Sequence, residues 1–451
     1  MRKTRRKQQS LSGGWGNHPR SKELKKISDI LDDNPMIAEL VTQDLIRAGG
    51  SPSCGAPGMT GEAVVRAAML QQMGDLTYED LAFYLEDSRS FRQFCRYGIG
   101  DSIPRKSTLQ ANISRIRPET WTAINQILVR YAMAVGLERG DKVRLDCTAV
   151  DANIAEPADS NLLYETVRVL TRELKRIKKL GYAVSFANHR RKARRCQMEI
   201  NYAKRQAKRI RPYKELLHVT EQTLAYAENA IRELSKLILE KKGEQVLEKL
   251  RHFTELGNKV VNQTRRRILQ KETVPASEKV VSLFEEHADI IRKDNRKTHF
   301  GHKVTISVGR YLILDCSVER GNPADTVLFG QMMDRVEAVT GRVPRQVAAD
   351  GGFASKANLE AAKRRGVKDM CFSKKRGLKV EEMVKSQWVY RQLKKFRAGV
   401  EGKISQLKRG FSMGRCNWSG FDGFQRYVLS SAVACNLLVM GRLLQAQEVT
   451  Y

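Results

Sequence analysis

The chain has 451 residues, of which 41% are hydrophobic, so it is long and apolar enough for two to four structural units with buried cores. Its 81 Lys and Arg against 50 Asp and Glu give a formal net charge of +31, which favours a polyanionic partner such as a nucleic acid. The eight Cys are scattered and form no C-x-x-C pair, which disfavours disulfide scaffolds and zinc ribbons. The basic N-terminus leads into a polar stretch, which disfavours a secreted protein. The apolar runs are shorter than the ~20 residues of a bilayer span, which disfavours a membrane protein.

The excess positive charge is concentrated in two segments. The first thirty residues contain 9 Lys and Arg against 2 Asp and Glu, and residues 161–271 contain 28 against 11. Together these segments carry 24 of the 31 net charges, so the rest of the chain has the charge balance of an ordinary globular protein.

Residues 1–58 are predicted to be a basic arm followed by a helical lead-in. Apolar residues recur at helical spacing between Ile27 and Leu45. The arm is either a solvated, disordered terminus or a segment that contacts phosphates or the minor groove. Its basic residues are Arg2, Lys3, Arg5, Arg6 and Lys7.

Residues 59–137 are predicted to form a compact helical unit. Thr60 and Thr77 can cap two helices, and Ser90–Tyr97 is a third helical stretch. A fourth helix is expected to begin at Pro104 and to include Trp121.

A Ser/Thr cap beside Arg105 and Lys106 suits a helix-turn-helix-like DNA-binding domain in which these two cations contact DNA. Because short helical bundles have many other uses, DNA recognition is one interpretation of this unit, and a purely structural bundle is the other.

Residues 156–290 are predicted to be a basic α-helical insertion with coiled-coil character. Apolar residues recur at steps of three, four or seven residues from Leu163 to Ile177 and from Leu217 to Ile238. Gly181 and Pro212 are expected to separate the helices of an elongated antiparallel hairpin or bundle.

The insertion also contains a dense basic run between residues 190 and 211. The run is either a solvated helix face or a surface that contacts DNA phosphates, because a one-sided charge surplus repels itself unless an anion neutralises it. The candidate phosphate-binding residues here are Arg190, Arg191, Arg194 and Arg195.

The residues on either side of the insertion alternate strand and helix patterns. Strands are expected at 142–150, 304–308, 311–318, 344–350 and 367–372, and helices at 324–339, 359–365 and towards residue 415. A hairpin joined to βαβ units predicts a mixed sheet flanked by helices, which is the element order of a ribonuclease H-like α/β fold. This split catalytic domain would comprise residues 138–155 and 291–445.

Two aspartates occupy unusual positions in these strands. Asp146 lies in the middle of a strand, where a carboxylate is a poor strand former and is unfavourable when buried unpaired. Asp350 ends a strand and precedes two glycines, which allow a sharp turn or the close approach of a ligand. Asp315 and Asp325 compete with them, but Asp315 fits the solvent face of its strand and Asp325 fits a helix start.

Glu401 is the third candidate acid, on a predicted helix. At about 100° per residue, Arg397 and Lys408 lie within about 40° of Glu401 on the helix surface. Glu401 either pairs with these cations or, together with the two aspartates, binds one or two Mg²⁺ ions, which prefer oxygen ligands. Two metal ions can stabilise the attacking and leaving oxygens of a phosphoryl displacement.

Three sequence blocks, Leu145–Val150, Val347–Phe353 and Phe396–Glu401, resemble the acidic blocks of DDE transposases from bacterial insertion sequences. They are most similar to the IS5/ISNCY-like group of the IS4-type superfamily. Arg397, Glu401 and Lys408 match the R-E-K part of its Y-R-E-K signature, but Lys394 stands where the signature has Tyr. The resemblance covers most of residues 60–440 and is weakest over the insertion.

The resemblance implies a transposase that cuts the ends of its element and joins them to target DNA. Asp146, Asp350 and Glu401 would hold two Mg²⁺ or Mn²⁺ ions, while Arg397 and Lys408 would contact phosphates or orient the glutamate. The helical unit would bind terminal inverted repeats, and the insertion would bind flanking or target DNA. A homodimer or higher assembly on DNA in the bacterial cytoplasm, associated with the nucleoid, follows from the same resemblance.

Three other classes remain as alternatives: a domesticated or non-catalytic DNA-binding protein, a structural coiled-coil protein, and a ribonuclease H-like structure-specific nuclease. A DNA-binding protein without catalysis does not need three acids. A nuclease or junction resolvase needs similar acids but no N-terminal domain that recognises DNA ends. The presence of both features therefore favours the transposase.

Overall fold

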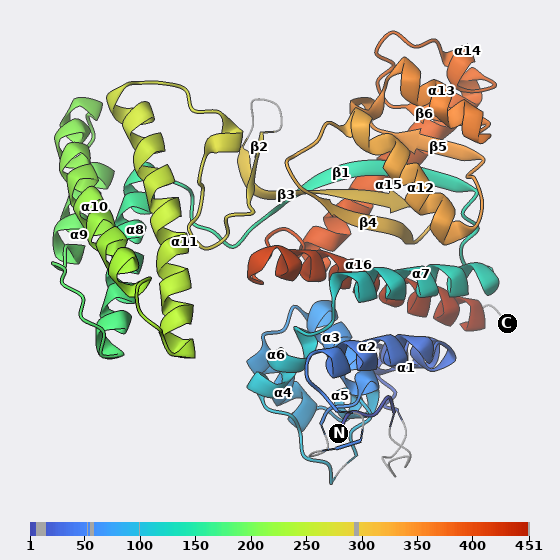
Figure 1. The fold of residues 1–451 in the computed structure, drawn as a ribbon. Coiled ribbons are helices and arrows are strands. Elements are labelled where there is room, and N and C mark those ends of the chain that lie inside the picture. Colours follow the sequence, from blue (N-terminus) through green and yellow to red (C-terminus); the bar gives the residue numbers. More distant parts are fainter. Residues whose placement is uncertain (6–14, 52, 55–57, 99, 293–296, 450–451) are drawn as a thin grey trace. The chain divides into compact units, whose positions relative to one another are not determined.

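The structure, a computed structural model, describes residues 1–5, 15–51, 53–54, 58–98, 100–292 and 297–449 (Figure 1). The chain forms two compact units. The first contains Met1–Ala152 and Ile291–Tyr451, and the second contains Asn153–Ile290. The finer division of the first unit at residues 58 and 137 stays a prediction.

The N-terminal part of the first unit is helical. The predicted caps are confirmed: the Thr60 hydroxyl accepts a hydrogen bond from the Ala63 N–H, and Thr77 forms a capping box with Asp80. The helices are α1 (Pro19–Asp33), α2 (Met36–Arg47), α3 (Gly61–Gly74), α4 (Tyr78–Asp87), α5 (Arg89–Phe94), α6 (Lys106–Ile113) and α7 (Pro118–Ala134).

The predicted single helix from Pro104 to Trp121 is wrong, because two helices form there. α6 ends at Ile113, and α7 begins at Pro118. Proline fits the first position of a helix and disfavours helical backbone in the residue before it, so a new helix starts at this point. The predicted Ser/Thr cap of α6 is also wrong, since Arg105 is the N-cap residue and its side chain makes no capping hydrogen bond.

The start of the predicted basic arm lies against the helical unit. The Gly61 N–H, at the first turn of α3, donates to the carbonyl of Lys3 at 3.1 Å. The Arg2 guanidinium donates to the carbonyl of Met59 at 3.3 Å. The arm thus satisfies a backbone donor that the helix leaves unpaired, so residues 1–5 are not a freely solvated tail. Arg6 and Lys7 lie outside the described residues.

A mixed six-stranded sheet forms the other part of the first unit. β1 pairs with β3 in antiparallel register, with Asp146 opposite Ile306, and it pairs with β5 in parallel register. The order is β2-β3-β1-β5-β6, with β4 also paired to β3. The strands are β1 (Lys142–Asp151), β2 (Asp289–Arg292), β3 (Thr298–Val308), β4 (Ile313–Glu319), β5 (Gln346–Ala349) and β6 (Asp369–Phe372). The mixed sheet is therefore confirmed, although β2 was not predicted.

Helices pack on this sheet (Figure 1). Buried apolar side chains of the helices and strands form one core cluster between them. α15 contacts β1, β5 and β6, and α12 contacts β3 and β4. Buried Phe329 of α12 and Phe372 of β6 are among the largest side chains of this core. The helices are α12 (Asp325–Thr340), α13 (Lys356–Arg365), α14 (Val380–Met383), α15 (Gln387–Gly410) and α16 (Gly420–Val449). This arrangement is compatible with a ribonuclease H-like domain.

α16 connects the sheet to the N-terminal helices. Asn436 of α16 accepts a hydrogen bond from the Ile313 N–H at 2.9 Å and donates to Asn125 of α7 at 2.8 Å. Asn125 in turn donates to the carbonyls of Ile313 and Leu314 in β4. Because all of these groups are buried, each amide must be paired, and the pairing fixes both helices against β4.

Among the described residues, Gly420–Glu448 is long and apolar enough to cross a membrane, which corrects the expectation that every apolar run is too short. The helix tolerates a few charged residues that interrupt the apolar run in sequence. However, 78% of its most apolar window is buried inside the protein, and core helices of soluble proteins pass the same test. The helix is thus weak evidence for a membrane span.

The second unit is a bundle of α8 (Asp159–Lys179), α9 (Arg190–Tyr202), α10 (Gln206–Leu234) and α11 (Lys241–Thr264), followed by a π-helical turn at Arg265–Leu269 and a 3-10 turn at Ala276–Glu278. The first predicted seam, from Leu163 to Ile177, is buried as expected. The second seam is wrong at its end, because α10 stops at Leu234 and Ile238 is fully exposed. Pro212 lies inside α10 rather than at its boundary.

Candidate active site

Asp146 comes from the middle of β1, and its side chain is 13% exposed. Its Oδ1 accepts a hydrogen bond from the Cys147 N–H at 2.7 Å. Its Oδ2 accepts one from the Arg397 guanidinium at 3.0 Å. The strand therefore holds this carboxylate in a largely buried position with one oxygen facing α15.

Asp350 lies directly after β5, at the start of the 3-10 turn Gly351–Phe353. The Ser373 hydroxyl donates to Asp350 Oδ1 at 2.8 Å and accepts a hydrogen bond from the Gly351 N–H at 2.9 Å. Burial acts to raise the pKa of Asp350, but the Ser373 hydrogen bond and the Arg397 charge outweigh it, so the pKa is lowered. Asp350 is therefore held in its ionised form.

Arg397 of α15 contacts all three candidate acids. One of its terminal nitrogens, Nη2, lies 3.0 Å from Asp146 Oδ2 and 3.0 Å from Asp350 Oδ1. The other, Nη1, lies 2.7 Å from Glu401 Oε1. The two aspartate oxygens share one nitrogen, so they lie at most 6.0 Å apart, which is the sum of the two distances. The guanidinium thus gathers three carboxylates from separate elements.

The three carboxylates have the chemistry of divalent-cation ligands, but the guanidinium of Arg397 lies among them. All three ligand candidates are carboxylates, the hard oxygen donors that Mg²⁺ and Mn²⁺ prefer. No group of three or more His, Cys, Asp or Glu side chains in the described part of the chain is close enough to form a metal site. Arg397 Nε is buried without a hydrogen-bond partner, so the guanidinium is not fully satisfied in this position.

Arg144, two residues before Asp146 on β1, docks α15 onto the sheet. Its guanidinium donates to the carbonyl of Phe396 at 3.0 Å and lies 4.6 Å from the centroid of the Phe396 ring. A Cβ atom on Gly399 would lie 2.2 Å from the Arg144 guanidinium, so glycine leaves room for the guanidinium in this position. The contact places Arg397, the next residue after Phe396, beside Asp146 in the middle of β1.

Lys408 lies further along α15, and its ammonium group donates to the carbonyl of Ala149 in β1 at 2.8 Å. The predicted residues Asp146, Asp350, Glu401, Arg397 and Lys408 are therefore brought to the same side of the sheet. Within this set, Lys408 contacts the backbone of β1, whereas Arg397 contacts the acids.

Asp315 is buried rather than solvent-facing, which corrects the sequence-based expectation. It forms an ion pair with Arg335 of α12 at 2.7 Å. Burial raises its pKa despite this partner. The alternation of residues along β4 does not predict that α12 covers the strand face that carries Asp315 and brings Arg335 to it. Asp325 is the first residue of α12, as predicted, and pairs with Lys303 at 3.0 Å.

Sequence reasoning missed two residues that position the acids, Ser373 and Arg144. Ser373 follows β6 directly, and β6 is the parallel neighbour of β5. Because the ends of parallel neighbours meet at one sheet edge, this order could have predicted its proximity to Asp350. Arg144 shares a strand face with Asp146 by its two-residue spacing.

Apart from Arg397 and Lys408, the predicted phosphate-binding cations lie on α6 and α9 or at their starts. Arg105 is exposed at the start of α6, and Lys106 pairs with Glu79 at 3.0 Å. In the second unit, Arg195 pairs with Glu215 at 3.3 Å, as does Lys192. Arg190, Arg191, Arg194 and Arg195 are all exposed on α9.

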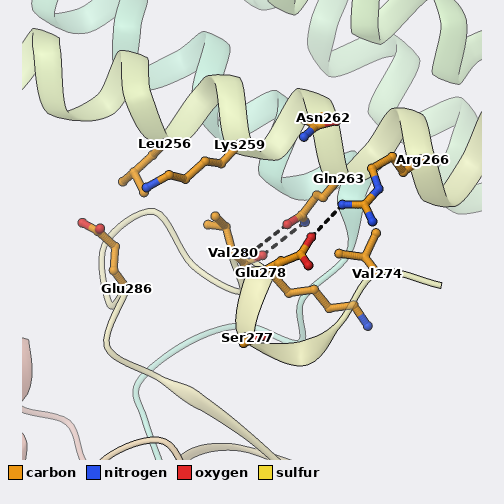
Figure 2. Close-up of a pocket in the computed structure, with 11 residues that line it drawn as sticks. Leu256, Lys259, Asn262, Gln263, Arg266, Val274, Ser277, Glu278, Val280 and Glu286 are labelled. Carbon is orange, nitrogen blue, oxygen red and sulfur yellow. Dashed lines mark hydrogen bonds and ion pairs between the residues drawn. The ribbon is translucent and has the colours of Figure 1, made fainter. Parts of the chain in front are cut away.

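A pocket of about 410 Å³ lies within the second unit, between α11 and residues 274–286 (Figure 2). Gln263 accepts a hydrogen bond from the Val280 N–H at 2.8 Å and donates to the Val280 carbonyl at 3.2 Å. Arg266 pairs with Glu278 at 2.7 Å. These contacts attach the segment to α11, and none of the predicted site residues lines the pocket.

Comparisons with known proteins identify two segments. Residues 16–115 match the family model described as "Transposase domain (DUF772)", and residues 279–437 match the one described as "Transposase DDE domain". The second segment contains Asp350, Arg397 and Glu401, whereas Asp146 precedes it on the other side of the insertion. No curated protein and no solved structure matches the chain. The two matches support a DDE transposase, an enzyme that acts on DNA.

We predict that Arg397→Gln lowers the melting temperature in EDTA by roughly 2–6 °C, because three carboxylates are then left without their shared cation. The same change should strengthen Mn²⁺ binding, measured by calorimetry, because the guanidinium no longer occupies the space among the acids. Lys395→Gln is the control, since it removes an exposed charge from the same helix. Unchanged Mn²⁺ affinity in Arg397→Gln would contradict the expectation that cation and guanidinium compete.

We predict that Ser373→Ala reduces the unfolding free energy at neutral pH and that the difference from wild type fades in acid. A lowered folded-state pKa stabilises the fold above the unfolded value of about 3.9 and ceases to do so as the pH falls through the folded value. Removing the Ser373 hydroxyl moves the Asp350 pKa back up. Denaturant titrations between pH 7 and about 3.5 measure this, and in an Asp350→Asn background Ser373→Ala should have no pH-dependent effect.

Proposed function

We propose that the protein is a DNA transposase of the IS5/ISNCY-like group that cuts the ends of its insertion sequence and transfers them to target DNA. The observation that carries the proposal is the convergence of Asp146, Asp350 and Glu401 on one guanidinium. These acids come from two strands and a helix, in a chain whose residues 279–437 are similar to transposase DDE domains.

Asp146, Asp350 and Glu401 would hold one or two Mg²⁺ or Mn²⁺ ions, and Arg397 would move from among them towards the DNA phosphates. Bound metal would stabilise the charge on the attacking and leaving oxygens of an in-line phosphoryl displacement. In the first step water would attack a phosphodiester at the end of the element, break its bond to the 3′-oxygen and free a 3′-hydroxyl. In the second step that hydroxyl would attack a phosphodiester of the target DNA and displace the 3′-oxygen of the target strand.

The residues of this chain supply rigidity and charge to that reaction. β1 fixes Asp146, the Ser373 hydroxyl orients Asp350, and Glu401 remains the most accessible of the three with a side chain 67% exposed. Arg144 attaches α15 to β1 through the carbonyl of Phe396. Arg397, once released from the acids, is long enough and forked enough to bind a phosphate through two hydrogen bonds.

DNA binding would be shared between the two basic parts of the chain. The helical unit with Arg105 and Lys106 would bind the inverted repeats, and α9 of the insertion would bind flanking or target DNA. Such a reaction on two paired ends calls for a homodimer or higher assembly. The proposed location is the bacterial cytoplasm, in association with the nucleoid.

We predict that Asp350→Asn lowers metal-dependent cleavage by about 10³-fold or more, while DNA binding stays nearly intact. Asp146→Asn and Glu401→Gln should behave alike. The substrate is a plasmid that carries the DNA flanking the gene, incubated with Mg²⁺ or Mn²⁺. Glu360→Gln, an exposed acid on α13, is the control. Undiminished cleavage by Asp350→Asn would refute the site, and binding without any cleavage by wild type would favour the non-catalytic DNA-binding protein.

We predict that Arg190→Gln with Arg191→Gln flattens the salt dependence of DNA affinity. Each phosphate that the variant no longer neutralises lowers the slope of log affinity against log salt by about 0.9, since fewer counterions are released. The control is Lys241→Gln with Lys242→Gln, which removes two exposed charges from α11. An equal slope in both double variants would make α9 a solvated helix face.

A further inference from the structure

A third basic segment lies beside the acids, outside the two that dominate the net charge. Residues 373–399 contain nine Lys and Arg against only Glu381 and Glu382. Their net charge is +7. All residues outside 1–30 and 161–271, taken together, also have a net charge of +7. The remainder of the chain is thus not evenly charged, because its surplus gathers in the loop after β6 and in the first half of α15.

The loop after β6 runs along the turn that contains Asp350. A Cβ atom on Gly351 would lie 2.6 Å from the Lys374 Cβ, so the Lys374 side chain rests on the Gly351 backbone. The ammonium group of Lys375 lies 5.8 Å from the centroid of the Tyr390 ring in α15. The loop therefore joins the edge of the sheet at Asp350 to the start of α15.

The outward face of α15 continues this surface towards Glu401. At about 100° per residue, Arg391, Lys395 and Gly402 fall within about 40° of one another, and Lys394 lies at the side nearer Glu401. All four residues are exposed. We name Lys374, Lys375, Arg391, Lys394 and Lys395 the basic strip.

The charges of the basic strip have no counter-charge. In the part of the chain that the structure describes, no carboxylate lies within 4.0 Å of any of its five side chains. On α9, by contrast, Lys192 and Arg195 share Glu215. Five neighbouring cations without an acid repel one another, so an anion bound across them would be stabilised.

Gly402 is an independent sign that something approaches this face. Glycine inside a helix is less favourable than alanine by about 0.5–1 kcal/mol, and Gly402 lies within the 24-residue helix α15. A Cβ atom there would meet no protein atom within 4 Å. Gly399 differs, since its Cβ would strike Arg144. Packing therefore explains Gly399 but not Gly402, which leaves the helix surface open next to Glu401.

We infer that the basic strip binds the phosphate backbone of the DNA strand that is cut, and that this strand crosses α15 at Gly402 to reach the acids. The inference rests on the proposed function and assigns to it a substrate path. Lys374 contacts the phosphates nearest Asp350, and Arg391 and Lys395 contact those further along the strand. The missing side chain at residue 402 lets the sugar–phosphate backbone lie close to the helix beside Glu401.

The test compares two quadruple variants in DNA binding. One is Lys374→Gln, Lys375→Gln, Arg391→Gln and Lys395→Gln. The matched control neutralises four exposed cations at the opposite ends of β5 and β6, through Arg342→Gln, Arg345→Gln, Arg364→Gln and Lys368→Gln. Fluorescence anisotropy measures the affinity for a labelled duplex of about 30 base pairs in EDTA over a range of KCl concentrations.

In the strip variant the salt slope should fall by up to about 0.9 for each phosphate that the strip binds, while the control keeps the wild-type slope. Melting temperature and Mn²⁺ affinity should be unchanged in both, because none of these residues contacts a carboxylate of the site. If the two variants have equal salt slopes and retain metal-dependent cleavage, the basic strip does not bind DNA, whereas the proposed transposase function is unaffected. Wild-type protein that neither binds nor cleaves DNA overturns the proposed function itself.

A second pair of variants tests the approach at Gly402 without changing charge. Gly402→Leu should weaken DNA binding by roughly tenfold or more and raise the melting temperature, because leucine is the better helix former. Gly410→Leu is the control, since residue 410 also faces open space, at the end of α15. Wild-type affinity and cleavage in Gly402→Leu would exclude a strand crossing at this position.

Discussion

Three carboxylates that are all ionised repel one another in a small volume unless a cation lies among them, and the candidate site of the first unit is built on this constraint. Arg397 supplies that cation, with contacts of 2.7–3.0 Å to Asp146, Asp350 and Glu401. The acids belong to elements that are distant in sequence, so each element must be held before the charges can meet. The three carboxylates proposed to bind metal are therefore held together by a guanidinium that α15 itself carries.

The position of α15 is the second condition, because the helix brings both the cation and one of the acids. Arg144 of β1 holds the helix through the carbonyl and ring of Phe396, and Gly399 gives the guanidinium room to do so. Arg144 and Asp146 are thus two residues apart on β1: Arg144 positions α15, and Asp146 faces it. A shift of α15 along the sheet would displace Arg397 and Glu401 together, so their geometry is coupled to one docking contact.

Much of the sheet and the choice of acids follows from the sequence, because strand alternation, the Gly pair after Asp350 and the helix spacing around Glu401 are local signals. Contacts between elements are not local, and the predictions failed there. Asp315 is buried because α12 brings Arg335 to its face, which no feature of β4 indicates. The seam at Ile238 failed because α10 ends four residues earlier. The basic strip lies in one contiguous stretch of sequence, but its place beside Asp350 depends on the contact of Lys374 with Gly351, which joins separate elements.

The position of α16 determines when the N-terminal helices can complete their packing during synthesis. Its residues pack against α1, α3 and α7, at the opposite end of the chain, and its Asn436 completes the buried amide pairing with Asn125. During synthesis the N-terminal helices therefore emerge long before the helix that covers them, and β1 waits for β3 until the whole insertion has been made. A chain that terminates early lacks this covering helix, so it exposes apolar surface instead of completing the first unit. Such a fragment is expected to be degraded.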